Sequence, residues 1–347
     1  YMDLHSIKLR LQQHLSDGLV IIAGSGLSCA EGLPGMQELA EHLCNEFRGK
    51  FTGADAEMWI SASKLIATEG LESALIKIPP TPNVESAIVA TVSNIISVHE
   101  RSIICNIFLG SHILRLTRLL KYIVKPETYL PIITTNYDRL VEIAVEEAGL
   151  GVNTMFVGHF SGKLDKNESR YSFCRSAKLI GRKVHLTTQL YALVCKPHGS
   201  LDWYSRNGIP VSYTGDLLNC ERLIITPGQN KYRNGYNSPF DIHLSQANSD
   251  IDKASRFLII GYGFNDDHLQ THLIPNIKNG KDTLILTYSL SEKARCLALE
   301  NRNVISIEHA DMDGTSGSSV IVDQVENFFP GIEIWDVDSF IEEVLMP

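Results

Sequence analysis

Short apolar runs recur along this chain, each followed by a polar or glycine-rich turn and then by a helical pattern. The runs are Leu19 to Ala23, Tyr129 to Thr135, Tyr191 to Lys196, Phe257 to Ile260, Leu284 to Thr287 and Val304 to Ile307. Buried strands that alternate with helices are typical of a parallel sheet covered on both faces. The pattern therefore predicts an α/β fold with a Rossmann-like, doubly wound, mainly parallel sheet. Its ligand site is expected along the carboxyl ends of the strands.

One part of the chain lacks this alternation. Between residues 51 and 125 strand-like runs disappear and helical spacing dominates, with a predicted loop at Pro79, Pro80 and Pro82. We therefore expect an all-helical insertion module at 51–125, within a domain made of residues 1–50 and 126–347. Its apolar stripes favour helix-to-helix packing, and a surface for oligomerisation or a partner is the alternative. Residues 151–190 are mixed and polar, and predict a surface excursion that contains a hairpin.

The stretch from Leu19 to Pro34 reads as a strand followed by a tight turn, and the residues from Met36 to Phe47 then take up helical spacing. Its turn holds Gly24, Ser25 and Gly26. Glycines let a backbone approach a ligand without interference from Cβ, and free N–H groups at a helix start favour a phosphate. The dinucleotide-binding fingerprint has a third glycine where this chain has Cys29. A nucleotide site and a purely structural turn are both open from this stretch alone.

The later turns add side chains that suit nucleotide binding and proton transfer. They supply Asn136, Asp138, His198, Gly261, Gly263, Asn265 and Asp266. Histidine has an unperturbed pKa suited to proton transfer near neutral pH, which makes His198 a candidate general base. Each residue also has a structural explanation, because Asn and Asp are common helix caps and a strand-end histidine can bond the backbone. The predicted sheet brings all of them to one edge.

Composition narrows the classes of protein. The chain has 347 residues, 44% hydrophobic content and a formal net charge of -9, which fits a folded protein and argues against broad nucleic-acid binding. Seven cysteines without a C-x-x-C pair indicate reduced thiols in the cytoplasm and no cysteine-type zinc site, so we expect no metal. No run approaches the roughly 18 uninterrupted apolar residues of a membrane span. P-loop, H-E-x-x-H and G-x-S-x-G motifs do not occur.

Four segments in order, AGSGLSCAEGLP, TTNYD, KPHGSLDW and GYGFNDDHL, resemble the sirtuin family and in particular its bacterial anti-phage defence branch. The resemblance implies that residues 1–50 and 126–347 form an NAD-binding domain. The residues it implies to hold the pyrophosphate are Gly24, Ser25, Gly26 and Ser28. It implies that Asn136 binds the nicotinamide ribose or positions a water, and that Asp138 faces the nicotinamide amide. It implies that His198 acts on the ribose hydroxyls as general base. Gly261, Gly263 and Asn265 would approach the adenosine end, and Thr287 and Ser289 the adenine ribose.

Two departures from the sirtuin pattern affect the expected reaction. Protein-deacylating sirtuins usually carry a four-cysteine zinc module, and their first loop continues with an aromatic residue and an arginine where this chain has Gly35, Met36 and Gln37. The resemblance therefore favours an NAD+ hydrolase that uses NAD+ as its substrate and gives nicotinamide and ADP-ribose. For this branch it also implies a regulated homo-oligomer with a partner such as a HerA-type ATPase. A protein deacylase without the zinc module and a non-catalytic NAD or ADP-ribose sensor are the alternatives.

Overall fold

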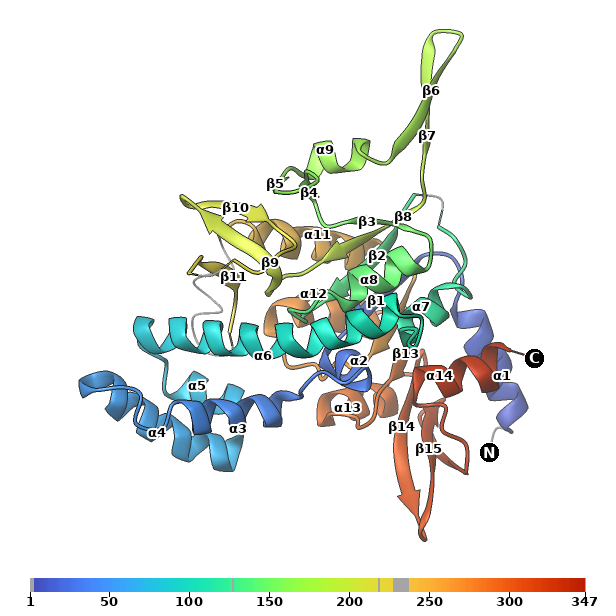
Figure 1. The fold of residues 1–347 in the computed structure, drawn as a ribbon. Coiled ribbons are helices and arrows are strands. Elements are labelled where there is room, and N and C mark those ends of the chain that lie inside the picture. Colours follow the sequence, from blue (N-terminus) through green and yellow to red (C-terminus); the bar gives the residue numbers. More distant parts are fainter. Residues whose placement is uncertain (1–2, 127, 218, 227–236, 347) are drawn as a thin grey trace.

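A nine-stranded sheet organises the protein (Figure 1). The structure, a computed structural model, describes residues 3–126, 128–217, 219–226 and 237–346. The strands, in spatial order, are β16 (Val325–Pro330), β15 (Thr315–Val322), β14 (Val304–Met312), β13 (Asp282–Leu286), β12 (Arg256–Ile260), β1 (Leu19–Ala23), β2 (Leu130–Thr134), β8 (Tyr191–Cys195) and β3 (Gly151–Asn153). Pairing is parallel from β3 to β14, and antiparallel between β14, β15 and β16. The predicted mainly parallel sheet is confirmed.

The chain winds in both directions from β1. It first moves to β2 and β8 on one side, and later to β12, β13 and β14 on the other. The reversal of strand order between β1 and β12 is a switch point, where doubly wound sheets bind ligands. All five residues of β1 are buried because both faces of the sheet are covered. Ile21 belongs to the core on one face, whereas Val20 and Ile22 belong to the core on the other.

Helices form a layer on each face of the sheet. The first layer contains α1 (Leu4–His14), α7 (Arg115–Leu120), α8 (Leu140–Glu147) and the C-terminal α14 (Val337–Phe340), which continues as the π-helix η1 (Ile341–Leu345). The second layer contains α11 (Phe240–Lys253), α12 (Asp267–Lys278) and α13 (Glu292–Glu300). A short helix, α2 (Ser25–Ala30), begins directly after β1, where the sequence indicated only a turn.

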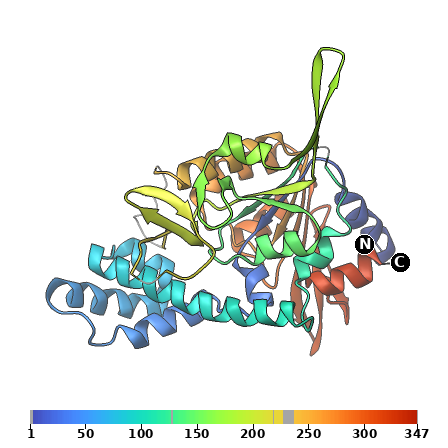
Figure 2. The ribbon, with the colours of Figure 1, turned by 45° about the horizontal axis from the view of Figure 1, so that its top comes forward.

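A group of helices extends from one side of the sheet domain (Figure 2). It consists of α3 (Met36–Glu46), α4 (Gly53–Glu69), α5 (Leu71–Lys77) and α6 (Pro82–Phe108), and we call it the helical module. Phe47, which follows α3, packs edge-to-face against Trp59 of α4 with ring centroids 4.9 Å apart. The helical module therefore includes α3, which lies before residue 51, whereas α7 packs against α8 of the sheet domain.

Among the described residues, α6 is long and apolar enough to cross a membrane by length and composition. In its most apolar window 44% of the residues are buried inside the protein. The helix packs on α3, α4 and β11 (Arg222–Ile224). A core helix meets the same criterion of length and composition, so this single helix is weak evidence of a membrane span.

The segments on either side of β8, 154–190 and 199–217 with 219–224, build an excursion on the sheet domain. A second sheet has the order β11, β9 (Gly199–Arg206), β10 (Ile209–Ser212), β5 (Gly162–Leu164) and β4 (Phe156–Val157). After α9 (Lys166–Tyr171), the strands β6 (Cys174–Ile180) and β7 (Lys183–Thr188) form a hairpin that projects from the body (Figure 1). The predicted surface excursion with a hairpin is present.

Candidate active site

Two cavities adjoin at the switch point. Cavity A has a volume of about 250 Å³ and includes Ser25, Ser28, Asn136, Asp138, His198, Gly263, Asn265 and Asp266 in its lining. Cavity B has a volume of about 290 Å³ and includes Gly26, Gly261, Thr287, Arg115, Tyr288, Trp335 and Asp336 in its lining. Ser25 and Gly26 are consecutive in the chain and line different cavities, so the turn after β1 separates the two. The sheet topology thus gathers most of the predicted site residues, as their positions at strand ends required.

The glycines at this turn serve a closer contact than the sequence indicated. Gly24 N donates to Ile260 O at 2.9 Å, and Gly26 N donates to Gly261 O at 3.0 Å. A Cβ on Gly24 would lie 2.4 Å from Gly261 O, and one on Gly261 would lie 2.5 Å from Leu27 N. The N–H groups of Gly24 and Gly26 are therefore not free to bind a phosphate, whereas the assignment of these two glycines to the ligand stays a prediction. Their amides bond the protein, because two strand ends cross backbone to backbone.

Asn136, Ser28 and Asp138 form one hydrogen-bonded chain in cavity A. Asn136 Nδ2 donates to Gly24 O at 2.9 Å and to Ser28 Oγ at 2.8 Å, and Ser28 Oγ donates to Asp138 Oδ2 at 2.8 Å. Asp138 Oδ1 also accepts from Leu140 N at 3.1 Å. Asp138 thus accepts from the first residue of α8 and lines the cavity as well. Burial raises the pKa of this carboxyl group.

His198 is held by a carboxylate that the sequence identified only as a possible cap. Its Nε2 contacts Asp266 Oδ2 as an ion pair when the imidazole is protonated. Asp266 Oδ1 accepts from His268 N at 2.9 Å and from Leu269 N at 3.2 Å, so the carboxylate is fixed at the start of α12. This contact involves Nε2 and does not involve Nδ1, the other ring nitrogen of His198. Gly199, with φ +91°, makes the turn next to it, where a Cβ would lie 2.1 Å from Leu223 O.

The five residues implied at the adenosine half of the ligand lie in different places, and Gly261 is among those that line cavity B. Gly263 and Asn265 line cavity A with His198, and their assignment to the adenosine end stays a prediction. Thr287 lines cavity B. Ser289 is absent from the linings of both cavities, and its carbonyl accepts from Thr287 Oγ1 at 3.2 Å. Phe264, which lies between Gly263 and Asn265, adopts φ +57°, a conformation that is strained for a bulky residue.

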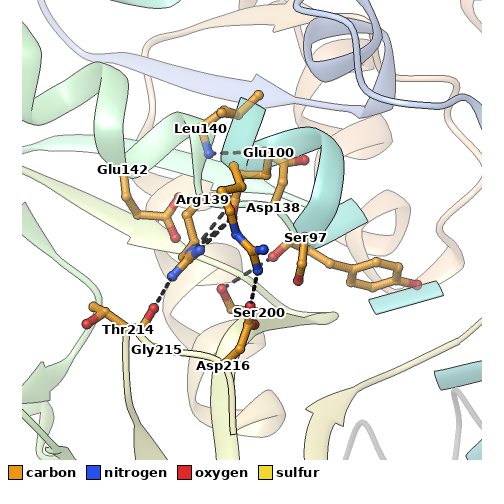
Figure 3. Close-up of polar contacts among 12 residues, drawn as sticks. Ser97, Glu100, Asp138, Arg139, Leu140, Glu142, Ser200, Thr214, Gly215 and Asp216 are labelled. Carbon is orange, nitrogen blue, oxygen red and sulfur yellow. Dashed lines mark hydrogen bonds and ion pairs between the residues drawn. The ribbon is translucent and has the colours of Figure 1, made fainter. Parts of the chain in front are cut away.

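Buried charges support the turn after β2, and sequence reasoning missed them. The fully buried Lys196 contacts Asp138 O through Nζ and lies 2.9 Å from Glu142 Oε1. Arg139 pairs at 2.6 Å with Glu100 of α6, whose side chain is fully buried, and donates to Thr214 O at 2.6 Å (Figure 3). In the sequence, the visible sign of these buried charges was Lys196, directly before Pro197 and His198. Glu100 lies 39 residues before Arg139, within a helical pattern that shows nothing of this pairing.

The helical module completes cavity A. Glu72 of α5 and Ile96 of α6 line it together with Leu39 of α3. Tyr137 also lines the cavity, and its hydroxyl donates to Ile225 O at 2.6 Å. Burial raises the pKa of Tyr137, and the charge of Glu72 acts in the same direction. The module is therefore part of the site.

Among the described residues, no group of three or more His, Cys, Asp or Glu side chains is placed to hold a metal ion. The groups that line cavities A and B are hydroxyls, amides, carboxylates, one histidine and one arginine. Such a set can bind the hydroxyls and amide of a nucleotide and move a proton. The two cavities lie at the switch point, where doubly wound α/β domains bind ligands.

The SIR2-like domain family matches residues 131–307, just over half of the chain. The chain belongs to this family, which implies an NAD-dependent activity. Similar solved structures include a crystal structure of a SIR2 homolog–NAD complex, with 10% identity, TM-score 0.40, and coverage of 84% of this chain and 85% of that chain. Another is Sir2Tm bound to a propionylated peptide, with 15% identity, TM-score 0.38, and coverage of 84% and 89%. Comparison with curated proteins finds no match.

Proposed function

We propose that this protein is an NAD+ hydrolase that releases nicotinamide and leaves ADP-ribose. The observation that carries the proposal is the presence of Asn136, Asp138 and His198 in cavity A, beside a second cavity across the turn at Ser25 and Gly26. Each cavity alone falls just below the roughly 300–1,000 Å³ of typical ligand sites. A dinucleotide divides naturally between them, with nicotinamide and its ribose in cavity A and adenosine in cavity B.

The reaction breaks the bond between nicotinamide and ribose C1′. The bonding electrons leave with nicotinamide, a water oxygen bonds C1′, and the water proton is released. Because the transition state resembles an oxocarbenium ion, fixed dipoles and a nearby carboxylate stabilise it more than a strong nucleophile would. Asn136 has its amide nitrogen fixed by Gly24 O and Ser28 Oγ, which leaves its oxygen to orient the ribose or water. His198, oriented by Asp266, accepts a proton from ribose or water.

Water rather than an acyl-lysine is the proposed second substrate. Glu72 and Ile96 of the helical module line cavity A, so the protein's own helices cover the reacting end of NAD+. An acyl-lysine side chain must reach ribose C1′ through this cover, whereas a water molecule needs no channel of that width. The volume of about 250 Å³ suits nicotinamide and one ribose.

We further propose that the enzyme is a regulated homo-oligomer of the anti-phage defence branch and acts with a HerA-type ATPase or a comparable partner. The four sequence segments that resemble that branch support this. The helical module also exposes apolar side chains at its surface, namely Ile60, Ile76, Val98 and Phe108. Light scattering of the protein, alone and with its genomic neighbour, is expected to show an oligomer. A monomer at every concentration under both conditions contradicts the assembly proposal.

Nicotinamide release from NAD+ tests the reaction. The purified protein, alone and with its genomic neighbour, is expected to release nicotinamide and ADP-ribose in equal amounts. His198→Ala and Asn136→Ala are each expected to lower the rate by about 100-fold to 10,000-fold, the usual loss for a positioned proton-transfer group. His5→Ala, on the exposed side of α1, is the matched control and is expected to keep the wild-type rate.

Three results contradict the assignment. With folding verified by circular dichroism, wild-type rates in His198→Ala or Asn136→Ala remove these residues from the chemistry. Turnover of an acyl-lysine peptide without net NAD+ hydrolysis identifies a deacylase. Calorimetric binding of NAD+ that stays intact through long incubation, with and without the partner, identifies a sensor.

A further inference from the structure

A third cavity, cavity C, lies near the amino ends of β2 and β8, away from the turns that form cavities A and B. It has a volume of about 400 Å³, within the usual range for small-molecule sites. Tyr129 directly precedes β2 and Tyr191 begins β8, and both line it. Lys166 and Arg170 of α9 line one side, and Lys253 at the end of α11 lines the other. None of the residues assigned to NAD+ lines this cavity.

The charges around cavity C have one sign. Lys166 and Arg170 are four residues apart on α9 and therefore project from one side of that helix. In the part of the chain that the structure describes, neither of them nor Lys253 forms an ion pair with a carboxylate. No Asp or Glu lines the cavity. Three cations thus converge on one space without a paired counter-charge.

The nearest buried carboxylate is already bonded to other groups. Asp250 Oδ1 accepts from the Tyr129 hydroxyl at 2.7 Å, and its Oδ2 accepts from Gln246 Nε2 at 2.9 Å. Burial raises the pKa of Asp250, and the charges of Lys253 and Lys166 act against that rise. The charges of Lys253 and Lys166 therefore act on this carboxylate, but it forms no direct ion pair with either of them.

A buried amide supplies the second, independent observation. Asn153 is 2% exposed and lines cavity C. Its Oδ1 accepts from Met155 N at 2.8 Å, whereas its Nδ2 has no hydrogen-bond partner within 3.5 Å among the described residues and interacts only weakly with the side chain of Tyr191, whose pKa it acts to lower. A buried donor without a hydrogen-bond partner is destabilising, and a ligand acceptor would remove that cost. Met155, at φ +64°, forms the strained turn that holds Asn153 in this position.

Aromatic rings make the cavity wall rigid. Tyr191 stacks on Phe173 with ring centroids 4.4 Å apart and on Tyr129 with centroids 5.7 Å apart. Burial raises the pKa of Tyr191, and the charge of the nearby Arg170 acts against that rise. The wall therefore holds Tyr191 as a neutral hydroxyl beside a guanidinium group.

We propose that cavity C binds a phosphorylated small molecule of up to mononucleotide size. Two ammonium groups, a guanidinium group, a buried amide nitrogen and a tyrosine hydroxyl are donors that suit a phosphoryl group, and no carboxylate in the lining repels it. This site is separate from the NAD+ site and goes beyond the proposed hydrolysis. The strands that it adjoins, β2 and β8, lead at their other ends to Asn136 and His198.

Calorimetric titration with pyrophosphate and with AMP tests the proposal. The wild-type chain is expected to bind at least one of these probes at low ionic strength, with an affinity that falls as salt is added. The double variant Lys166→Gln/Arg170→Gln is expected to lose about tenfold or more in affinity, because it removes two charged hydrogen-bond donors. Lys163→Gln, at an exposed position on β5, is the control and is expected to bind like wild type.

Asn153→Asp separates binding from folding. The aspartate keeps an oxygen to accept from Met155 N but replaces the unpartnered donor with an acceptor, so affinity for the probe is expected to fall about tenfold or more. Asn136→Ala, in the NAD+ site, is expected to retain this binding. Absence of heat with both probes at millimolar concentration overturns the proposal. Unchanged affinity in the double variant, or loss in Asn136→Ala alone, overturns it as well.

Discussion

At the carboxyl edge of the sheet, the turns after β1 and β12 are held together in a different way from the turns after β2 and β8. On the side of β1 and β12, Gly24, Gly26 and Gly261 let two backbones cross, and the joining hydrogen bonds are backbone to backbone. On the side of β2 and β8, the joining groups are charged side chains, with the ammonium of Lys196 against Asp138 O and Glu142. One half depends on the absence of side chains and the other on their charge.

This difference separates the residues that fix the shape of the site from the residues proposed to take part in the reaction. The glycine half fixes where cavities A and B meet, and no titratable group takes part in its contacts. The charged half carries Asn136, Asp138 and His198, whose positions depend on hydrogen bonds that only particular side chains supply. Buried ion pairs often add little stability relative to apolar replacements, although removal of one partner is costly. Their presence here is explained by the orientation that they impose on the turn after β2.

Removal of the buried ammonium is expected to have the largest effect. Lys196→Met leaves the buried Glu142 carboxylate and the Asp138 carbonyl without their cation, and should lower the free energy of unfolding by about 3–5 kcal/mol. Urea denaturation measures the loss. Lys278→Met, at an exposed position on α12, should stay within about 0.5 kcal/mol of wild type.

The double variant Lys196→Met/Glu142→Leu sharpens this test. Because it removes both charges, it should recover part of the stability lost in Lys196→Met. A single variant as stable as wild type shows that the charged half is not held by this pair. The distinction between the two halves then has no energetic basis.

The glycine contact is expected to be nearly as sensitive. Gly261→Ala places a Cβ 2.5 Å from Leu27 N at a residue with φ +59°, so overpacking and backbone strain together should cost about 2–4 kcal/mol. Gly280→Ala is the matched control, since its φ is +96° but nothing lies within 4 Å of the added Cβ. Thermal and urea unfolding should show a loss of about 1 kcal/mol there. Equal losses in both variants would mean that the crossing of the two turns adds nothing beyond strain.

The sequence predicted the fold because the sheet is built from local patterns. Short apolar runs followed by polar turns reveal parallel strands, and strand ends of one direction share an edge, so Asn136, Asp138 and His198 were expected together. The partner of a glycine is not a local property. Gly24 meets Gly261 across 237 positions of sequence (261 − 24), and only the strand order brings them into contact.

Buried charges were hidden for a related reason. Lys196 and Glu100 belong to residue types that are usually solvated, and burial of either is decided by elements far away in the chain. Glu72 likewise reads as a surface residue of a helix until α5 is placed over cavity A. Asp266 was predicted to be a possible cap, and its Oδ1 does accept from the start of α12. Its contact with His198 could not be predicted, because it depends on where the fold places the end of β8 relative to the start of α12.

The smallest expected effect is a difference in pH dependence. His243 is fully buried behind the charged half and accepts from Lys196 N at 3.1 Å. Burial lowers its pKa from 6.5 to about 3, and the charge of Lys196 acts in the same direction. Because the unfolded chain binds a proton below about pH 6.5 and the folded protein does not, stability is complete above that pH and falls as the pH decreases toward 3.

His243→Asn keeps an acceptor for Lys196 N and removes this titration. Its free energy of unfolding should fall less steeply with acid than that of wild type, by up to about 1.4 kcal/mol per pH unit. His14 behind the glycine half, whose pKa burial lowers to about 4, remains in the variant and keeps part of the slope. Urea unfolding at several pH values between 6.5 and 4 measures the difference. Identical slopes in the two proteins would show that His243 is not a buried neutral support of the charged half.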